Sequence, residues 1–192
     1  AGADANTAIG YYSFIFNTTG YGNSALGYYA LFNNTTGYYN SAIGMNALVA
    51  NSTGNYNSAL GTGALYYTTG SYNSALGVNA GSQIATGNSN TFLGYNTGSQ
   101  FGLQKTDAVN SMALGSGAYT TANNQVVIGN DSITMTLLKG NVGIGTASPN
   151  NTIQVAGLIN FNNSIYGTSL GYQAGNITTG NFNSFIGYQA GY

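Results

Sequence analysis

Five side chains of this 192-residue sequence carry a formal charge, and acid–base or metal chemistry would have to start from them. They are Asp4, Lys105, Asp107, Asp131 and Lys139, and the sequence contains no Arg, Glu, His or Cys. General acid–base catalysis near neutral pH usually needs His or a Glu with a shifted pKa, and zinc sites mostly need His or Cys. A serine nucleophile has no His to activate it. We therefore expect a protein that is not an enzyme and holds no cofactor or metal.

The net charge of −1 also narrows the range of partners. Neutralising nucleic-acid phosphates requires clustered Lys or Arg, and anionic membrane surfaces attract polybasic segments. No apolar run reaches the roughly 18 residues of a membrane span, so we expect neither nucleic-acid binding nor membrane insertion. Weak self-repulsion favours association, and the shortage of Lys and Arg leaves few sites for trypsin-like proteases. Both are typical of an extracellular fibre, although repeat duplication alone produces the same bias.

A short repeating unit organises most of the sequence. It begins with Asn-Ser-Ala-Leu-Gly or a close variant and starts at Asn6, Asn23, Asn40, Asn57, Asn73, Asn90 and Asn110, which gives a period of about 17 residues. Each of the first four units closes with a Thr-Gly turn. A fixed period of this length indicates one small unit stacked on copies of itself, whose neighbours supply the core. With 43% hydrophobic residues, the chain is expected to be folded rather than disordered.

The unit favours short extended segments separated by corners. Gly follows the Leu or Ile of each unit, as in Gly27 and Gly61, and Gly permits the positive φ that a corner requires. Gly recurs too often for a helix. A hairpin meander would favour Asn-Gly, Asp-Gly or Gly-Gly turns, and the sequence has none. We therefore predict an all-β fold, a parallel β-solenoid or β-roll of about 17-residue coils, completed by one chain or by three, with a short β insert.

Stacked coils place equivalent residues above one another, about 4.8 Å apart. Adjacent residues of a strand point to opposite faces, so we expect the bulky position to point inward and the Ala before it to point outward. The predicted core residues are Ile9, Leu26, Ile43, Leu60, Leu76 and Leu93. The predicted amide ladder consists of Asn6, Asn23, Asn40, Asn57 and Asn73. Tyr12, Tyr29 and similar residues are expected to form partial aromatic stacks.

Three regions follow from the period. Residues 1–122 hold the repeats, residues 123–162 break the period as a β connector or insert, and residues 163–192 resume the repeats. Within the insert, strands are expected at 125–129, 132–138 and 152–161.

The Asn-Ser-Ala-Leu-Gly and Ala-Leu-x-x-x-Thr-Thr-Gly units resemble the head repeats of trimeric autotransporter adhesins, which are β-rolls whose core is completed by three chains. Residues 140–149, Gly-Asn-Val-Gly-Ile-Gly-Thr-Ala-Ser-Pro, with Ile153 to Gly157 after them, are similar to a segment of bacteriophage tail fibres and related secreted fibre proteins. The unit of this chain is longer than the adhesin-head repeat. The resemblance implies an oligomeric extracellular or virion fibre.

Three functions fit these observations. The first is a structural fibre built from copies of the chain, end to end or as a trimer. The second is a receptor-binding shaft that presents Tyr, Asn and Thr to cell-surface glycans, and the third is an ice-binding solenoid that uses the Thr pairs. A filament would join the unfinished last unit to the first residues of the next copy, through Asn183, Phe185, Ile186, Tyr192, Ala1 and Ala5. The alternative is that these 192 residues are a piece of a longer chain.

Overall fold

The computed structural model describes residues 5–137 and four short segments, 142–144, 153–155, 168–170 and 184–186. The chain divides into two units, Ala1–Thr134 and Met135–Tyr192, which are described separately.

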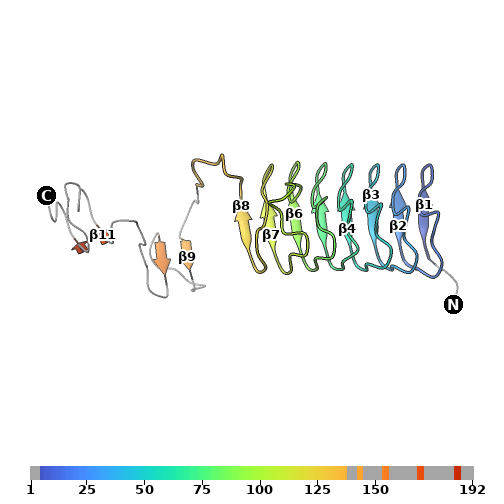
Figure 1. Cartoon of the computed structure of the whole chain (residues 1–192), viewed down its shortest axis with the longest axis horizontal. Helices are drawn as coiled ribbons and strands as arrows, with labels where there is room; N and C mark the ends of the chain where they lie inside the picture. The colour runs from blue at the N-terminus through green and yellow to red at the C-terminus, as the bar shows by residue number, and fades with distance from the viewer. Residues whose placement is uncertain (1–4, 138–141, 145–152, 156–167, 171–183, 187–192) are drawn as a thin grey trace. The chain divides into compact units, whose positions relative to one another are not determined.

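The first unit contains one parallel sheet of eight three-residue strands, which pair in the order of the sequence (Figure 1). The strands are β1 (Thr7–Ile9), β2 (Ser24–Leu26), β3 (Ser41–Ile43), β4 (Ser58–Leu60), β5 (Ser74–Leu76), β6 (Thr91–Leu93), β7 (Met112–Leu114) and β8 (Val126–Ile128). Between consecutive strands the chain makes one turn of the solenoid. Equivalent asparagines of the first coils are 17 residues apart and bonded to each other. The predicted all-β fold, a parallel solenoid with coils of this length, is confirmed.

Equivalent residues pair directly in this sheet. Ser24 lies beside Ser41, and Ala25 beside Ala42, and the same register continues along the repeats. From β2 to β5, each row of the sheet therefore carries one kind of side chain, serine, alanine, or leucine and isoleucine, at a spacing of about 4.8 Å. Contacts between neighbouring coils are nearly the same at each level.

Glycine after the strand makes the first corner of each coil. Gly27 and Gly61 have φ values of 141° and 138°, a region that L-residues with a side chain hardly enter. A Cβ on Gly27 would also lie 2.7 Å from the carbonyl carbon of Gly44 in the next coil. The corner therefore needs glycine for its conformation and for the close approach of the next coil.

The predicted core residues do not point into the coil of their own chain. The side chains of Ile9, Leu26, Ile43, Leu60, Leu76 and Leu93 are between 42% and 60% exposed. The residue before each from β2 to β6 points inward instead and is buried, as Ala42 is. Alternation along a strand determines which residues share a face, but not which face is inside. Beneath most of these strands the coil is so thin that alanine fills the space.

Bulkier core residues come from the second half of each coil. Leu31, Leu48 and Leu65 are completely buried and pack with the strand alanines. Their φ values are 51° to 52°, in the left-handed region that leucine rarely adopts. This conformation turns the leucine side chain into the coil.

One level of the core is built differently. In β6 the inward position is Phe92 rather than alanine, and it is 1% exposed. The next two positions in the leucine row are Gly81 and Gly98. A Cβ on Gly81 would lie 2.7 Å from a methyl carbon of Leu65 and 2.8 Å from a ring carbon of Phe92, and a Cβ on Gly98 would lie 2.5 Å from the same ring. The phenyl ring therefore occupies the space that two leucine side chains fill in other coils.

The predicted boundary at residue 122 falls inside the solenoid. β8 lies beyond it and pairs with β7 in the same register, Met112 beside Val126. The strand predicted near residue 127 is therefore present, but as part of the repeat sheet. The strand predicted at 132–138 is not formed over its described residues, 132–137.

The second unit contains two further parallel pairs. β9 (Val142–Ile144) pairs with β10 (Ile153–Val155), and β11 (Thr168–Leu170) pairs with β12 (Ser184–Ile186). Thr168 lies beside Ser184, so the offset along the sequence in the last pair is close to that in the first unit. This parallel pairing agrees with a return of the repeats.

Candidate functional site

The predicted asparagine ladder is confirmed by hydrogen bonds. The backbone N–H of Asn40 donates to Oδ1 of Asn23 at 2.9 Å, and Asn40 Nδ2 donates to the carbonyl oxygen of Gly54 at 2.8 Å. Asn57 repeats the first bond, donating its N–H to Asn40 Oδ1 at 2.9 Å. The members from Asn23 to Asn90 are each at most 1% exposed. Each side chain satisfies backbone groups that the corners before the strands leave unpaired.

The ladder spans the array from Asn6 to Asn90. Asn6 Oδ1 accepts the N–H of Asn23 at 2.8 Å, and Asn90 Oδ1 accepts the N–H of Ser111 at 3.0 Å. Ser111, rather than Asn110, is therefore the structural equivalent in the next coil. It follows Asn90 by 21 residues, and the extra residues of this unit form a loop.

Removing one member is the direct test of the ladder. We expect Asn40→Ala to lower the free energy of unfolding by about 3 kcal/mol, because the buried N–H of Asn57 loses its acceptor and two side-chain donations disappear. Chemical unfolding followed by circular dichroism measures this difference. Asn33→Ala is the matched control, since Asn33 is exposed, and it should change stability by less than about 0.5 kcal/mol. Equal effects of the two changes would contradict a structural role for the ladder.

A second, shorter amide ladder was not predicted. Asn51 Nδ2 donates to Asn34 Oδ1 at 2.8 Å, and Asn34 Nδ2 donates to Asn17 Oδ1 at 3.2 Å. Asn34 and Asn51 are fully buried. The ladder ends where Thr68 replaces the amide, and Asn51 Oδ1 is left without a hydrogen-bond partner. The available signal was the recurrence of asparagine at positions 17, 34 and 51, once in each repeat.

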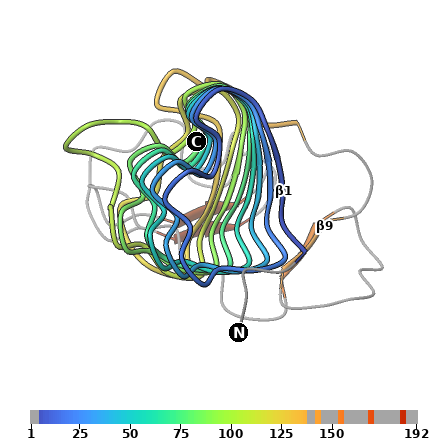
Figure 2. The ribbon, with the colours of Figure 1, turned by 90° about the vertical axis from the view of Figure 1, so that its right-hand side faces the viewer.

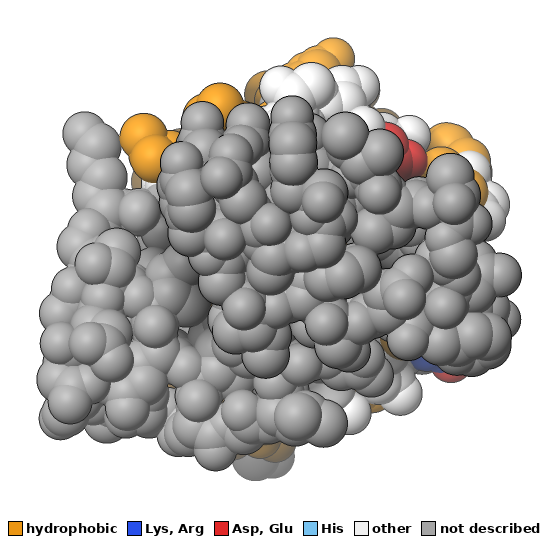
Figure 3. Space-filling model, turned by 90° about the vertical axis from the view of Figure 1, so that its left-hand side faces the viewer, with side chains coloured by type: hydrophobic (Ala, Val, Ile, Leu, Met, Phe, Trp, Pro, Cys, Tyr) orange, Lys and Arg blue, Asp and Glu red, His pale blue; other side chains and the backbone are white. Residues whose placement is uncertain are grey.

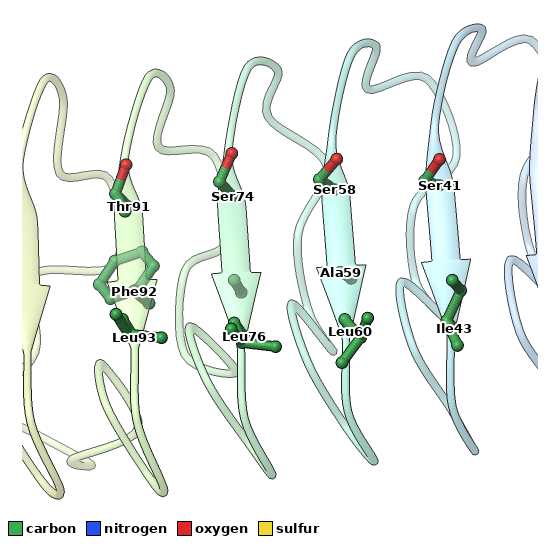
Figure 4. A pocket seen from close by; sticks show the side chains of 11 residues that line it. Ser41, Ile43, Ser58, Ala59, Leu60, Ser74, Leu76, Thr91, Phe92 and Leu93 are labelled. Atoms are coloured by element: carbon green, nitrogen blue, oxygen red, sulfur yellow. The ribbon is translucent and has the colours of Figure 1, made fainter.

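The outer face of the sheet is a regular surface that the structure leaves open. Figure 4 shows one row of hydroxyl side chains and one row of aliphatic side chains across β3 to β6, with Ala59 and Phe92 behind the ribbon. The two rows line a shallow groove of about 370 Å³. Leu60 and Leu76 are each 48% exposed. The residues predicted as core therefore form an apolar row on the surface, which we call the aliphatic row.

Tyrosines form stacks beside the sheet. The rings of Tyr56 and Tyr72 lie 5.1 Å apart at 8°, and those of Tyr39 and Tyr56 lie 5.3 Å apart at 30°. Tyr12 and Tyr29 are tilted at 40°, so the predicted partial stacks are present. Burial between neighbouring rings raises the pKa of Tyr56. Tyr39, Tyr56 and Tyr72 all have φ between 54° and 61°, a conformation that favours Asn or Gly.

The described charged groups are engaged in local contacts and do not form a cluster. Lys105 pairs with Asp107 in one loop, and its hydrogen bond lowers the pKa of Asp107. Tyr119 donates to Asp131 at 2.8 Å, which raises the pKa of Tyr119. In Figure 3 the described side chains that remain visible are mostly hydrophobic or uncharged. Over the described residues there is no group of three acidic, His or Cys side chains that could hold a metal, and no helix long and apolar enough to cross a membrane.

Several threonines of the Thr-Gly turns donate their hydroxyls to backbone oxygens of the next coil. Thr18 Oγ1 donates to Thr35 O at 2.8 Å, and Thr35 Oγ1 donates to Ser52 O at 2.9 Å. Thr69 Oγ1 donates to Ala85 O at 3.0 Å. These bonds occupy the hydroxyls of Thr18, Thr35 and Thr69, whereas Thr19, Thr36 and Thr53 are exposed, so an ice-binding surface remains a prediction that we do not develop.

Half of the residues predicted for the filament ends lie outside the described residues. Ala1, Asn183 and Tyr192 lie outside the described residues. Phe185 and Ile186 belong to β12, and Ala5 is exposed with φ 62°. The end-to-end joint remains a prediction.

Comparison with known proteins identifies no neighbour: no family model, no curated protein and no solved structure matches the chain.

Proposed function

We propose that this chain is a non-catalytic structural segment of an extracellular or virion fibre, in which the parallel sheets of several copies pack against one another. The observation that carries the proposal is the aliphatic row, a regular line of apolar side chains that is exposed on the outer face of the sheet. Two faces of that kind exclude water most completely when they cover each other. The resemblance to adhesin-head repeats, whose cores are completed by three chains, favours a trimer.

The aliphatic row suits a second copy of the same chain better than an unrelated partner. Its side chains recur at the strand spacing of about 4.8 Å, and a second copy offers the same spacing, so the rows can interdigitate along the whole sheet. Burying a leucine that is half exposed contributes on the order of 1 kcal/mol. Repeated over the members of the row, this gives a substantial driving force, and a net charge of −1 opposes it little.

Other features of the stack suit a fibre. The buried amide ladders tie each coil to the next along the long direction of the sheet. Lys and Arg are nearly absent from the sequence, so few sites are open to trypsin-like proteases. These properties support a stiff extracellular shaft and involve no chemistry by the chain itself.

The test is the mass of the native assembly. For the unmodified chain, light scattering after size exclusion should give three times the mass of a single chain. Leu60→Lys combined with Leu76→Lys should give single chains, because like charges at about 4.8 Å would face the apolar surface of each partner. A single-chain mass for the unmodified protein would contradict the proposal.

Leu103→Lys is the matched control. Leu103 is also an exposed leucine, at 53%, but it lies in the long loop of the unit that begins at Asn90 and not on the sheet. This variant should retain the trimer mass. If both variants assemble equally well, the aliphatic row is not the interface, and the assembly must be sought elsewhere on the coil.

A further inference from the structure

One place in the array departs from the repeat in several ways at once. The unit that starts at Asn57 is one residue short, and the unit that starts at Asn90 takes 21 residues to reach Ser111. The extra residues form a loop that projects from the side of the coil away from the strands (Figure 2). Beside this loop the surface is hollowed into a groove of about 350 Å³.

Aromatic side chains stand at the walls of this groove. Tyr66 and Tyr67 come from one coil, with ring centroids 4.6 Å apart at 67°. Phe101 comes from the long loop and is 79% exposed. Tyr67 is 48% exposed, so rings from two different coils are open to the same space. A large apolar side chain with so little cover is available to pack against a ligand.

Polar groups of the same groove are amides and hydroxyls rather than charges. Asn79 Nδ2 donates to Asn96 Oδ1 at 3.0 Å, which fixes the two amides relative to each other. That bond leaves the Asn79 carbonyl as an acceptor and the Asn96 amide as a donor. Gln83 also lines the groove and contributes a further donor and acceptor. The lining contains no Asp, Glu, Lys, Arg or His side chain.

We infer that this groove binds a neutral oligosaccharide. Sugars present C–H faces that pack on aromatic rings and hydroxyls that pair with fixed amide donors and acceptors, and the groove offers both. The absence of a charged side chain from its lining gives no advantage to sialylated or sulfated glycans. The one ion pair of the long loop, between Lys105 and Asp107, is internally neutralised.

The groove does not depend on the proposed assembly. All its lining residues belong to one chain, and the loop beside it projects away from the strands. Copies that cover the sheet face would therefore leave the groove open. Three grooves in one trimer would strengthen binding to a surface with many glycans without any new contact.

The experiment measures binding of a panel of neutral hexasaccharides, made of glucose, mannose or N-acetylglucosamine, and of sialylated and sulfated oligosaccharides, by calorimetry and saturation-transfer NMR. We expect at least one neutral member to bind with a Kd on the order of 1 mM, and Tyr67→Ala or Phe101→Ala to weaken it about fivefold. Tyr72→Ala is the control, because the exposure of Tyr72, 60%, lies between those of Tyr67 and Phe101, but Tyr72 lies outside the groove; this change should leave Kd unchanged.

Three outcomes would overturn the inference: no neutral member binding below about 10 mM, binding only of the anionic members, or equal losses in Tyr72→Ala and Tyr67→Ala. Circular dichroism melting of each variant checks that the fold is intact, and little change is expected because the altered side chains are exposed. The single-chain variant with Leu60→Lys and Leu76→Lys should bind the hexasaccharide with the same Kd per site. That result separates failure of the groove from failure of the assembly.

Discussion

Gly61→Ala is expected to destabilise the solenoid by about 3–6 kcal/mol, because backbone strain and overpacking act together at this corner. The φ of Gly61 is 138°, outside the range of alanine. Its new Cβ would lie 2.6 Å from the carbonyl carbon of Gly77 in the next coil. Backbone cannot yield there as a flexible side chain would, so two coils must separate. Thermal unfolding by circular dichroism should show a fall in Tm of at least about 10 °C.

Gly102→Ala is the control for this expectation. Gly102 also has a positive φ, 75°, but a Cβ there would meet nothing within 4 Å. Only the left-handed conformation is then unfavourable, at about 1 kcal/mol. A loss in Gly61→Ala no larger than in Gly102→Ala would show that the corner tolerates a side chain, and the close stacking of coils would have to be reconsidered.

Phe92→Ala is expected to lower the free energy of unfolding by about 3–5 kcal/mol, as for other buried phenylalanines. Its ring is 1% exposed and lies against Gly81 and Gly98. Neither glycine has a side chain that could move into the space that the ring leaves. Chemical unfolding measures the change, and Phe101→Ala, in an exposed loop, is the control with an expected change of less than about 0.5 kcal/mol.

A second substitution makes the packing argument sharper. Gly81→Leu in the Phe92→Ala background would restore the pairing of a strand alanine with a leucine that preceding coils use. Gly81 has φ 65°, near the values of Leu31 and Leu48, so the backbone is already suitable. A Cβ there would lie 2.7 Å from a methyl carbon of Leu65, which must turn into the space that the ring leaves. We expect the double variant to be more stable than Phe92→Ala alone. If the double variant and Phe92→Ala were equally stable, the idea that the Phe92 ring takes the place of leucine side chains would be contradicted.

Much of the fold was predictable from the period. A repeated Asn before each strand and a repeated Gly after it are strong signals. Because the coils stack in register, each coil places the same residue in the same backbone conformation and the same contacts. The amide ladder through Asn40 and the glycine corner at Gly61 both follow from that reasoning. Parallel pairing follows from the lack of hairpin turns.

The inward and outward faces were assigned the wrong way round. Hydrophobicity suggested that Leu60 is inside and Ala59 outside, yet the thickness of the coil decides this, and no local pattern reports that thickness. The filling of the core by Leu48 in a left-handed conformation was also hidden, since leucine is rare there. A useful signal was the recurrence of alanine at this position in the first five units, beside either Leu or Ile, which is typical of a tight site.

The aliphatic row and the groove beside the long loop differ in how far the sequence predicts them. The aliphatic row recurs with the period, so its members were identified correctly even though their side was not. The groove arises where the period fails, through Phe101 in the long loop and Tyr67 in another coil. Residues brought together by an insertion have no spacing rule, and only the folded chain shows that they meet.

The in-register stacking has a consequence for how such a protein changes its length. Each regular coil makes the same contacts with the coil after it as with the coil before it. Duplicating one whole repeat unit would therefore create no new kind of contact between coils. The molecule would grow by one step of about 4.8 Å, with its interior unchanged. Loss of a unit would shorten it by the same step. The length of the solenoid can therefore change in steps of one coil when the gene duplicates or loses a repeat. The irregular coil around Phe92 would not be altered by such a change elsewhere in the array.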